Sequence, residues 1–218
     1  MTPSAQAPAR LHPALLTILI LSYLTGIISP RISGIADWFQ VLTPIHLTAT
    51  LVVLLWFHTD WRPAFLFYAV LAVLTGYFVE VLGVHTGYVF GNYAYGQGLG
   101  PRILDVPPVI GLNWLLLSYC CGAVCDRLPV PVYIKTVAAA TTMVTLDIFI
   151  EPVAVRLDFW TWFGQPVPLQ NYFGWWLISL ALLGIWYGLP FRKQNPLAGW
   201  LLALQFAFFL GHRLFSYL

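Results

Sequence analysis

Charged residues are scarce in this chain of 218 residues: they make up 8% of it, whereas hydrophobic residues make up 60%. A soluble domain carries about 25% charged residues, because its surface must be hydrated. A chain with so few charges cannot cover a globule with polar groups, so its outer surface is expected to face lipid. The formal net charge of +2 also argues against nucleic acid as a partner, because nucleic-acid binding requires a strongly basic surface.

Cysteine is rarer still. The three cysteines, Cys120, Cys121 and Cys125, lie together in one apolar segment, where small buried packing groups are expected. No histidine lies near them, and their spacing matches no structural zinc motif. We therefore predict no metal site. The sequence also lacks a GxGxxG motif and a GK[ST] ending, so phosphate binding is not expected.

Long apolar stretches dominate the rest of the sequence. A membrane-spanning helix needs roughly 20 mostly apolar residues, and about seven stretches qualify. These stretches cover residues 13–28, 39–57, 64–83, 109–125, 133–153, 173–189 and 197–217. They predict an all-α fold, a polytopic transmembrane helix bundle of about seven spans. Residues 1–12 form a short polar N-terminal tail, and residues 13–218 form a single transmembrane helical domain.

Seven spans would place the two ends of the chain on opposite sides of a membrane. Six of the ten lysines and arginines then lie on the N-terminal side, which weakly favours that side as cytoplasmic. The two longest connections, 84–108 and 154–172, lie together on the opposite side. Long loops in a compact protein usually carry function, so we expect this face to hold the site.

Three carboxylates interrupt the apolar segments on that same side. Glu80 closes the third predicted span, and Asp147 and Glu151 close the fifth. A spacing of four residues stacks Asp147 and Glu151 on one helix face, about 5–6 Å apart. Two such acids would repel each other if both were ionised, so one is expected to keep its proton and to be able to donate it. Acids within a span are functional by default, because burying one costs roughly 2.5–3.5 kcal/mol.

Aromatic residues and glycines alternate in the first long connection, and aromatic residues recur in the second. Rings at this density can cover an apolar ligand, and glycine allows the loops to pack closely. An amide in the second connection can hold a water molecule or a hydroxyl group. The candidate binding residues beside the acids are His85, Tyr88, Tyr93, Tyr95, Trp160, Trp162, Asn171 and Trp175.

Less specific interpretations exist for both features. The acids could form ion pairs near the lipid headgroups with Arg102, Arg156 or Arg213, and the rings could form an interfacial aromatic belt. A retinal protein is excluded, because that chemistry needs a lysine within a late span and residues 197–217 contain none. A proton-coupled transporter is a further alternative, because buried acids also serve proton relays.

Two blocks of sequence resemble the membrane hydratases of carotenoid biosynthesis, the family of γ-carotene 1′-hydratase and bisanhydrobacterioruberin hydratase. The first block reads Glu80-x-x-Gly-x-x-Thr-Gly-x-x-Phe-Gly-x-Tyr-x-Tyr, followed by Leu99-Gly100-Pro101 and Val106-Pro107. The second contains Asp147-x-x-x-Glu151-Pro152, Trp160-x-Trp162 and Asn171-Tyr172-Phe173-Gly174-Trp175. The resemblance extends roughly from the third predicted span through the sixth.

The resemblance implies a carotenoid hydratase, a hydro-lyase that adds water across the terminal C1′=C2′ double bond of an acyclic carotenoid end group. An acid must protonate the alkene, and aromatic rings can hold the resulting tertiary cation by roughly 0.5–2 kcal/mol each. A second carboxylate or amide must place the water and take its proton. Asp147 or Glu80 is the expected acid, and the other groups, Glu151 among them, orient the water. Hydration changes no oxidation state, so no cofactor is expected.

The expected partners are a lipophilic carotenoid substrate and the lipid bilayer, and the resemblance allows association with other carotenoid enzymes. The expected location is the cell (cytoplasmic) membrane, which the chain crosses several times. Two alternatives stay open at this point. One is the proton-coupled transporter, and the other is a membrane protein that binds carotenoid or lipid without catalysis.

Overall fold

The computed structural model describes residues 11, 13–32, 34, 36–164 and 166–215. The predicted tail, 1–12, therefore lies outside the described residues apart from Leu11, as do residues 216 and 217 of the last predicted span. Seven α-helices lie in the described part and confirm the all-α class. They are α1 (Pro13–Ile28), α2 (Ala36–Trp56), α3 (Pro63–Thr86), α4 (Val109–Cys125), α5 (Val132–Arg156), α6 (Leu169–Gly188) and α7 (Ala198–Leu214).

Each helix coincides with one predicted apolar segment, with ends that differ by a few residues. Among the described residues, three helices are long and apolar enough to cross a bilayer: α3, α5, and α1 together with the 3-10 turn η1 (Ser29–Arg31). Large apolar side chains such as Leu24 and Phe67 point outward from these helices. A chain with this surface is a membrane protein. The number of spans stays a prediction.

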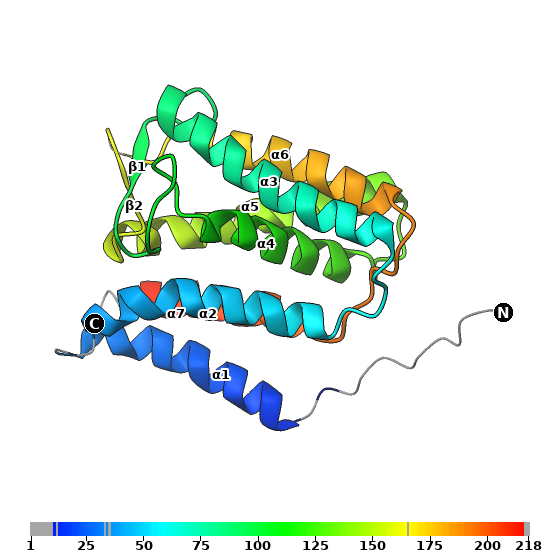
Figure 1. Ribbon diagram of the computed structural model, residues 1–218, viewed down its shortest axis with the longest axis horizontal. Coiled ribbons are helices and arrows are strands. Elements are labelled where there is room, and N and C mark those ends of the chain that lie inside the picture. The colour runs from blue at the N-terminus through cyan, green and yellow to red at the C-terminus, as the bar shows by residue number, and fades with distance from the viewer. Residues whose placement is uncertain (1–10, 12, 33, 35, 165, 216–218) are drawn as a thin grey trace.

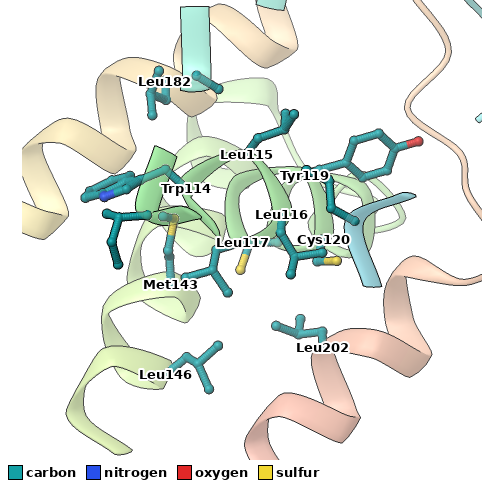
Figure 2. Close-up of a cluster of buried hydrophobic side chains, with 14 of the residues drawn as sticks. Trp114, Leu115, Leu116, Leu117, Tyr119, Cys120, Met143, Leu146, Leu182 and Leu202 are labelled. Atoms are coloured by element: carbon teal, nitrogen blue, oxygen red, sulfur yellow. The ribbon is translucent and has the colours of Figure 1, made fainter. Parts of the chain in front are cut away.

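The central helix of the bundle is α4. It packs against α2, α3, α5, α6 and α7, and almost all of its side chains are buried. Figure 2 shows α4 nearly end-on, with Trp114, Leu116 and Tyr119 among the side chains that radiate from it toward its neighbours. A helix that is apolar all round must be enclosed on all sides, and α4 satisfies this rule through its five neighbours.

Successive helices run in opposite directions, so the long connections gather at one end of the bundle (Figure 1). There the connection after α3 contains strand β1 (Tyr93–Tyr95), and the connection after α5 contains strand β2 (Trp160–Trp162). The two strands pair antiparallel, with Tyr93 opposite Trp162 and Tyr95 opposite Trp160. The two predicted loops are therefore joined by a small sheet.

The predicted helix ends near the acids need correction. Glu80 does not close its helix, because α3 continues to Thr86 and ends at Gly87, whose positive φ of 69° suits glycine. Glu151 does not close α5 either, because that helix continues through Pro152 to Arg156. The acids thus project from within regular helix, which holds their backbones more rigidly than a helix end would.

The close approach of α3 and α4 depends on Gly76. A Cβ atom at this position would lie 2.3 Å from the Cβ atom of Trp114. We therefore expect Gly76→Ala to lower the free energy of unfolding by about 1–3 kcal/mol through overpacking. Thermal unfolding in detergent, followed by size-exclusion chromatography, measures this loss. Gly184→Ala in α6 is the matched control, because nothing lies within 4 Å of a Cβ atom there. Equal stability of the two variants would contradict the packing argument.

Candidate active site

The small sheet brings four aromatic side chains to one place. Side chains alternate between the two faces of a strand, so the first and third residues of each strand share a face. Tyr93, Tyr95, Trp160 and Trp162 are accordingly buried, and Thr161 between the two tryptophans is exposed. The ring centroids of Tyr93 and Trp162 lie 5.0 Å apart, and those of Tyr95 and Trp160 lie 6.0 Å apart. The sheet thereby forms an aromatic cover over the ends of α3 and α5.

Beneath this cover lies a polar cavity of about 30 Å³. One water molecule needs about 10–15 Å³ on this measure, so the cavity has room for a small number of waters. All three acids line it, from two helices that are far apart in sequence. The lining residues are Glu80, Phe90, Tyr93, Tyr95, Ile110, Asn113, Asp147, Ile150, Glu151, Trp160, Trp162, Asn171 and Trp175.

Glu80 is held by three hydrogen-bond donors. Its Oε2 atom accepts from the Tyr93 hydroxyl at 2.5 Å and from the Tyr95 hydroxyl at 2.8 Å. Its Oε1 atom accepts from Trp114 Nε1 at 3.1 Å. Burial, and then the charge of nearby Glu80, raises the pKa of both tyrosines far above the usual value, so both hydroxyls keep their protons. With three donors pointed at it, Glu80 is suited to be an ionised carboxylate.

Glu151 is held in a similar way. Trp162 Nε1 donates to its Oε2 atom at 2.8 Å, and Trp160 Nε1 donates to the same atom at 3.1 Å. The Oε1 atom accepts from the amide nitrogen of Asn171 at 3.0 Å. An indole N–H can only donate, so this environment also suits an ionised carboxylate.

Asp147 differs from the other two acids. Its Oδ2 atom accepts from the same Asn171 amide nitrogen at 3.0 Å, which makes Asn171 a bridge between Asp147 and Glu151. Its Oδ1 atom is buried and has no hydrogen-bond partner among the described residues. The side chain is only 1% exposed. Among the three acids, Asp147 is therefore the one with a carboxylate oxygen that no described side chain pairs.

The ion-pair interpretation of the acids finds no support among the described residues. The ion pairs there join Arg62 to Asp60, His85 to Asp105 and Lys135 to Asp126, and none includes an acid of the cavity. Three carboxylates thus share one buried cavity, and none of them forms an ion pair with a described residue. Mutual repulsion opposes the ionisation of all three, and the hydrogen bonds favour keeping the proton on Asp147.

A second, larger cavity of about 350 Å³ lies beside the first. Helices α1, α2, α4, α5 and α7 contribute to its lining, which is mostly apolar, and four residues line both cavities: Ile110, Asn113, Ile150 and Trp160. We call this larger space the apolar chamber. Trp38 and Leu42 of α2 are among its lining residues and are also exposed on the outside of the bundle. Its volume lies in the range of small-molecule sites.

Most candidates from the sequence meet at the polar cavity: the three acids, Tyr93, Tyr95, Trp160, Trp162, Asn171 and Trp175. Two candidates lie outside its lining. The His85 side chain is half exposed, and its Nε2 atom lies 3.6 Å from Oδ2 of Asp105. Tyr88 is 86% exposed. Tyr88 instead takes part in the loop structure, where its carbonyl oxygen accepts from Gln170 Nε2 at 2.6 Å.

Sequence reasoning overlooked Trp114 and Asn113, two neighbouring residues of α4. Trp114 donates to Glu80, and its ring stacks on Trp175 with centroids 4.1 Å apart. Asn113 lines both cavities. A buried indole N–H needs a hydrogen-bond acceptor, and this requirement could have indicated from the sequence that Trp114 contacts an acid. Among the described residues, no group of three or more His, Cys, Asp or Glu side chains is arranged to hold a metal.

Comparison with known proteins supports the resemblance seen in the sequence motifs. The chain is 32% identical over 124 residues to bisanhydrobacterioruberin hydratase of Haloarcula japonica. The aligned region covers 50% of this chain and 41% of the relative, so the chain matches less than half of that relative's length. No solved structure matches the chain.

The family comparison covers much more of the chain. Residues 39–215 match the family described as carotenoid biosynthesis protein. This region contains α3 through α7 and both strands, and with them every residue that lines the polar cavity. The likeness to carotenoid hydratases that the two sequence blocks predict is thereby confirmed at the level of the family. The chain belongs to the carotenoid biosynthesis protein family.

Proposed function

We propose that the chain is a cofactor-independent hydratase that adds water across the terminal C1′=C2′ double bond of an acyclic carotenoid end group of the γ-carotene or bisanhydrobacterioruberin type. The observation that carries the proposal is the buried Oδ1 atom of Asp147, which has no hydrogen-bond partner among the described residues, on a residue that lines a water-sized cavity beside an apolar chamber. The named activity of the haloarchaeal relative agrees with this chemistry.

The first step is protonation of the alkene by Asp147. The apolar chamber takes the isoprenoid end, and the wall that both cavities share brings the double bond to Asp147. The Oδ1–H group transfers its proton to the less substituted carbon, and the pair of π electrons forms the new C–H bond. A tertiary cation forms on the neighbouring carbon, and Asp147 becomes a carboxylate.

The aromatic cover and the ionised acids then stabilise the cation. Trp160, Trp162 and Trp175 line the cavity, and each desolvated ring whose face meets the cation contributes up to roughly 2 kcal/mol. Glu80 and Glu151 add negative charge that is already fixed in place by hydrogen bonds, so no reorganisation is needed when the cation forms.

Water attack completes the reaction. A water in the polar cavity forms the C–O bond with the cationic carbon, and Glu151 accepts the proton that this water loses. Asn171 donates hydrogen bonds to both Glu151 and Asp147, so it holds the two side chains in a fixed relation. The proton then passes from Glu151 to the carboxylate of Asp147. The product is a tertiary alcohol, and the acid is restored for the next cycle.

The location in the cell follows from the same proposal. A carotenoid dissolves in the bilayer, so it must enter sideways. We propose that it enters at α2, where Trp38 and Leu42 line the chamber and are exposed. We propose that the chain crosses the cell membrane several times, with its N-terminal side in the cytoplasm and the polar cavity near the opposite face. Other enzymes of carotenoid synthesis are then possible neighbours in the membrane.

Purified chain in lipid vesicles with an acyclic carotenoid tests the proposal. We expect a product that has gained one water, with its oxygen drawn from water labelled with heavy oxygen, as measured by mass spectrometry. Unchanged pigment that nevertheless co-purifies with the chain would replace the proposal with a carotenoid-binding carrier. Uptake into vesicles that depends on a pH gradient, without a new hydroxyl group, would favour a transporter. The gathering of all three acids in one cavity speaks against a relay across the bundle.

A further inference from the structure

Four residues line both the polar cavity and the apolar chamber, and Asn113 of α4 differs from the other three. Ile110 and Ile150 are aliphatic, and the indole N–H of Trp160 already donates to Glu151. Asn113 is the member of this shared wall whose side chain offers both a donor and an acceptor. No hydrogen bond joins that side chain to another described residue. The amide of Asn113 therefore lies at the boundary of the two cavities with its hydrogen-bonding capacity unused by the described part of the chain.

The backbone of α4 holds Asn113 in a fixed place. This helix is enclosed by five others, and the next residue along it, Trp114, donates to Glu80. Ile110, Asn113 and Leu117 follow one another at helical spacing and line the chamber from one face of α4. A side chain on a rigid, enclosed helix can position a small molecule more precisely than a side chain on a loop.

The chemistry of the amide suits a water molecule that is about to react. The proposed reaction needs a water with one O–H group directed at Glu151, which takes its proton, and with a lone pair directed at the cation. The second O–H group of this water then needs an acceptor, and Oδ1 of Asn113 can be that acceptor. Asn113 reaches the wet side and the apolar side of the wall, so a water on its amide lies between the base and the isoprenoid end.

A tertiary cation in this site has two possible fates. Capture by water gives the alcohol. Loss of a proton from a neighbouring carbon gives an alkene: the electron pair of the broken C–H bond becomes the π bond, and a carboxylate of the cavity takes the proton. If the proton leaves the carbon that was protonated first, the substrate is recovered, and if it leaves a methyl group, the double bond moves to the end of the chain. This second fate needs no further reagent.

We infer that Asn113 holds the attacking water against the cation and thereby decides between hydration and return to an alkene. The inference rests on the proposed function, because the cation forms only if the alkene is first protonated. Asn113 acts through the water and is a positioning residue, so protonation itself should not depend on it. Without the amide, the same site would become an alkene isomerase.

The test runs the reaction in vesicles in heavy water, where every protonation delivers deuterium to carbon. Mass spectrometry at early times counts hydrated product and deuterium in the recovered alkene, and we expect the wild type to give mainly hydrated product. Asn113→Leu keeps the shape of the side chain and removes the amide. We expect it to lower the ratio of hydrated product to deuterated alkene at least about tenfold, while the sum of the two changes far less.

Two further variants separate positioning from general damage. Asn113→Ser keeps a donor and an acceptor and leaves room for one more water, so it should recover part of the ratio. Asn92→Leu makes the same change as Asn113→Leu at an exposed residue that lines neither cavity, and it should keep the wild-type ratio. Asn113→Leu should also melt no lower than the wild type, because the amide that it removes has no partner among the described residues.

The two possible failures give different results. An unchanged ratio in Asn113→Leu, whether or not the total turnover falls, would overturn the inference and leave the proposed function standing. A wild type that neither hydrates the carotenoid nor brings deuterium into it would overturn the proposed function, and the inference with it.

Discussion

Asp147→Asn is expected to reduce the rate of hydrated product formation by roughly 10²–10⁴-fold, the usual contribution of a general acid. The variant keeps the shape of the side chain and can keep an oxygen facing the Asn171 amide nitrogen, which bonds Oδ2 in the wild type. It loses the one acidic proton that the unpartnered Oδ1 position offers to an alkene. Conversion of an acyclic carotenoid in vesicles, with the product measured by mass, gives the rate.

Asp105→Asn is the matched control for this prediction. It makes the same chemical change in the connection between β1 and α4, where the Asp105 side chain is largely exposed and lies outside the polar cavity. We expect it to keep the wild-type rate. A wild-type rate in Asp147→Asn, with the same amount of protein in the membrane, would show that another group supplies the proton. Glu80 would then be the next acid to test.

Glu151→Gln is expected to lower both activity and stability. The Oε2 atom of Glu151 accepts from two indole N–H groups, which cannot accept in return. If the new amide nitrogen faced the two indoles, its N–H groups would face their N–H groups, and none of these donors would have an acceptor. If it faced Asn171 instead, Asn171 would have to turn its oxygen toward it and give up its bond to Asp147. An unpaired buried donor costs about 1–3 kcal/mol, and loss of the base should cost at least about 10²-fold in rate.

Glu80→Gln is the comparison variant, because the hydrogen-bond donors around Glu80 differ from those around Glu151 in one chemical respect. Tyr93 and Tyr95 can accept as well as donate, so their hydroxyls can turn to pair with an amide nitrogen, while the amide oxygen keeps the bond from Trp114. We expect Glu80→Gln to unfold at nearly the wild-type temperature and Glu151→Gln several degrees lower. Thermal unfolding in detergent measures both. Equal melting temperatures for the two variants would contradict the hydrogen-bond roles described for Glu151.

The hydrophobic pattern was sufficient to predict the helices. Segments such as 109–125 and 133–153 are too long and too apolar for any other structure, and their positions agree with α4 and α5. The helix ends were less predictable. Apolar patterning does not say that α3 runs on past Glu80, since this depends on backbone hydrogen bonds that close only at Gly87. The positions of the helices along the chain were therefore predicted better than their ends.

Placement of side chains around the site could be predicted only in part. His85 and Tyr88 are close to Glu80 in sequence, but neither lines the polar cavity. His85 lies in the last turn of α3 beside Asp105, and Tyr88 lies in the turn that follows and is 86% exposed. Trp114 lies 34 residues from Glu80 and still donates to it, because α3 and α4 pack closely at Gly76. A contact of this kind depends on the packing of two helices, which no local pattern in the sequence specifies.

The sequence by itself determined the class of the protein and the position of its acids along the chain, because hydrophobic length and the cost of a buried carboxylate are properties of single segments. Only the tertiary structure decided that Oδ1 of Asp147 has no hydrogen-bond partner among the described residues, while both carboxylate oxygens of Glu80 and of Glu151 accept hydrogen bonds. That difference comes from the pairing of β1 with β2, which sets the tyrosines and tryptophans over the acids. The alternation in Tyr-Ala-Tyr and Trp-Thr-Trp predicts which side chains share a face, but the register between two strands so far apart is set by the helices that carry them.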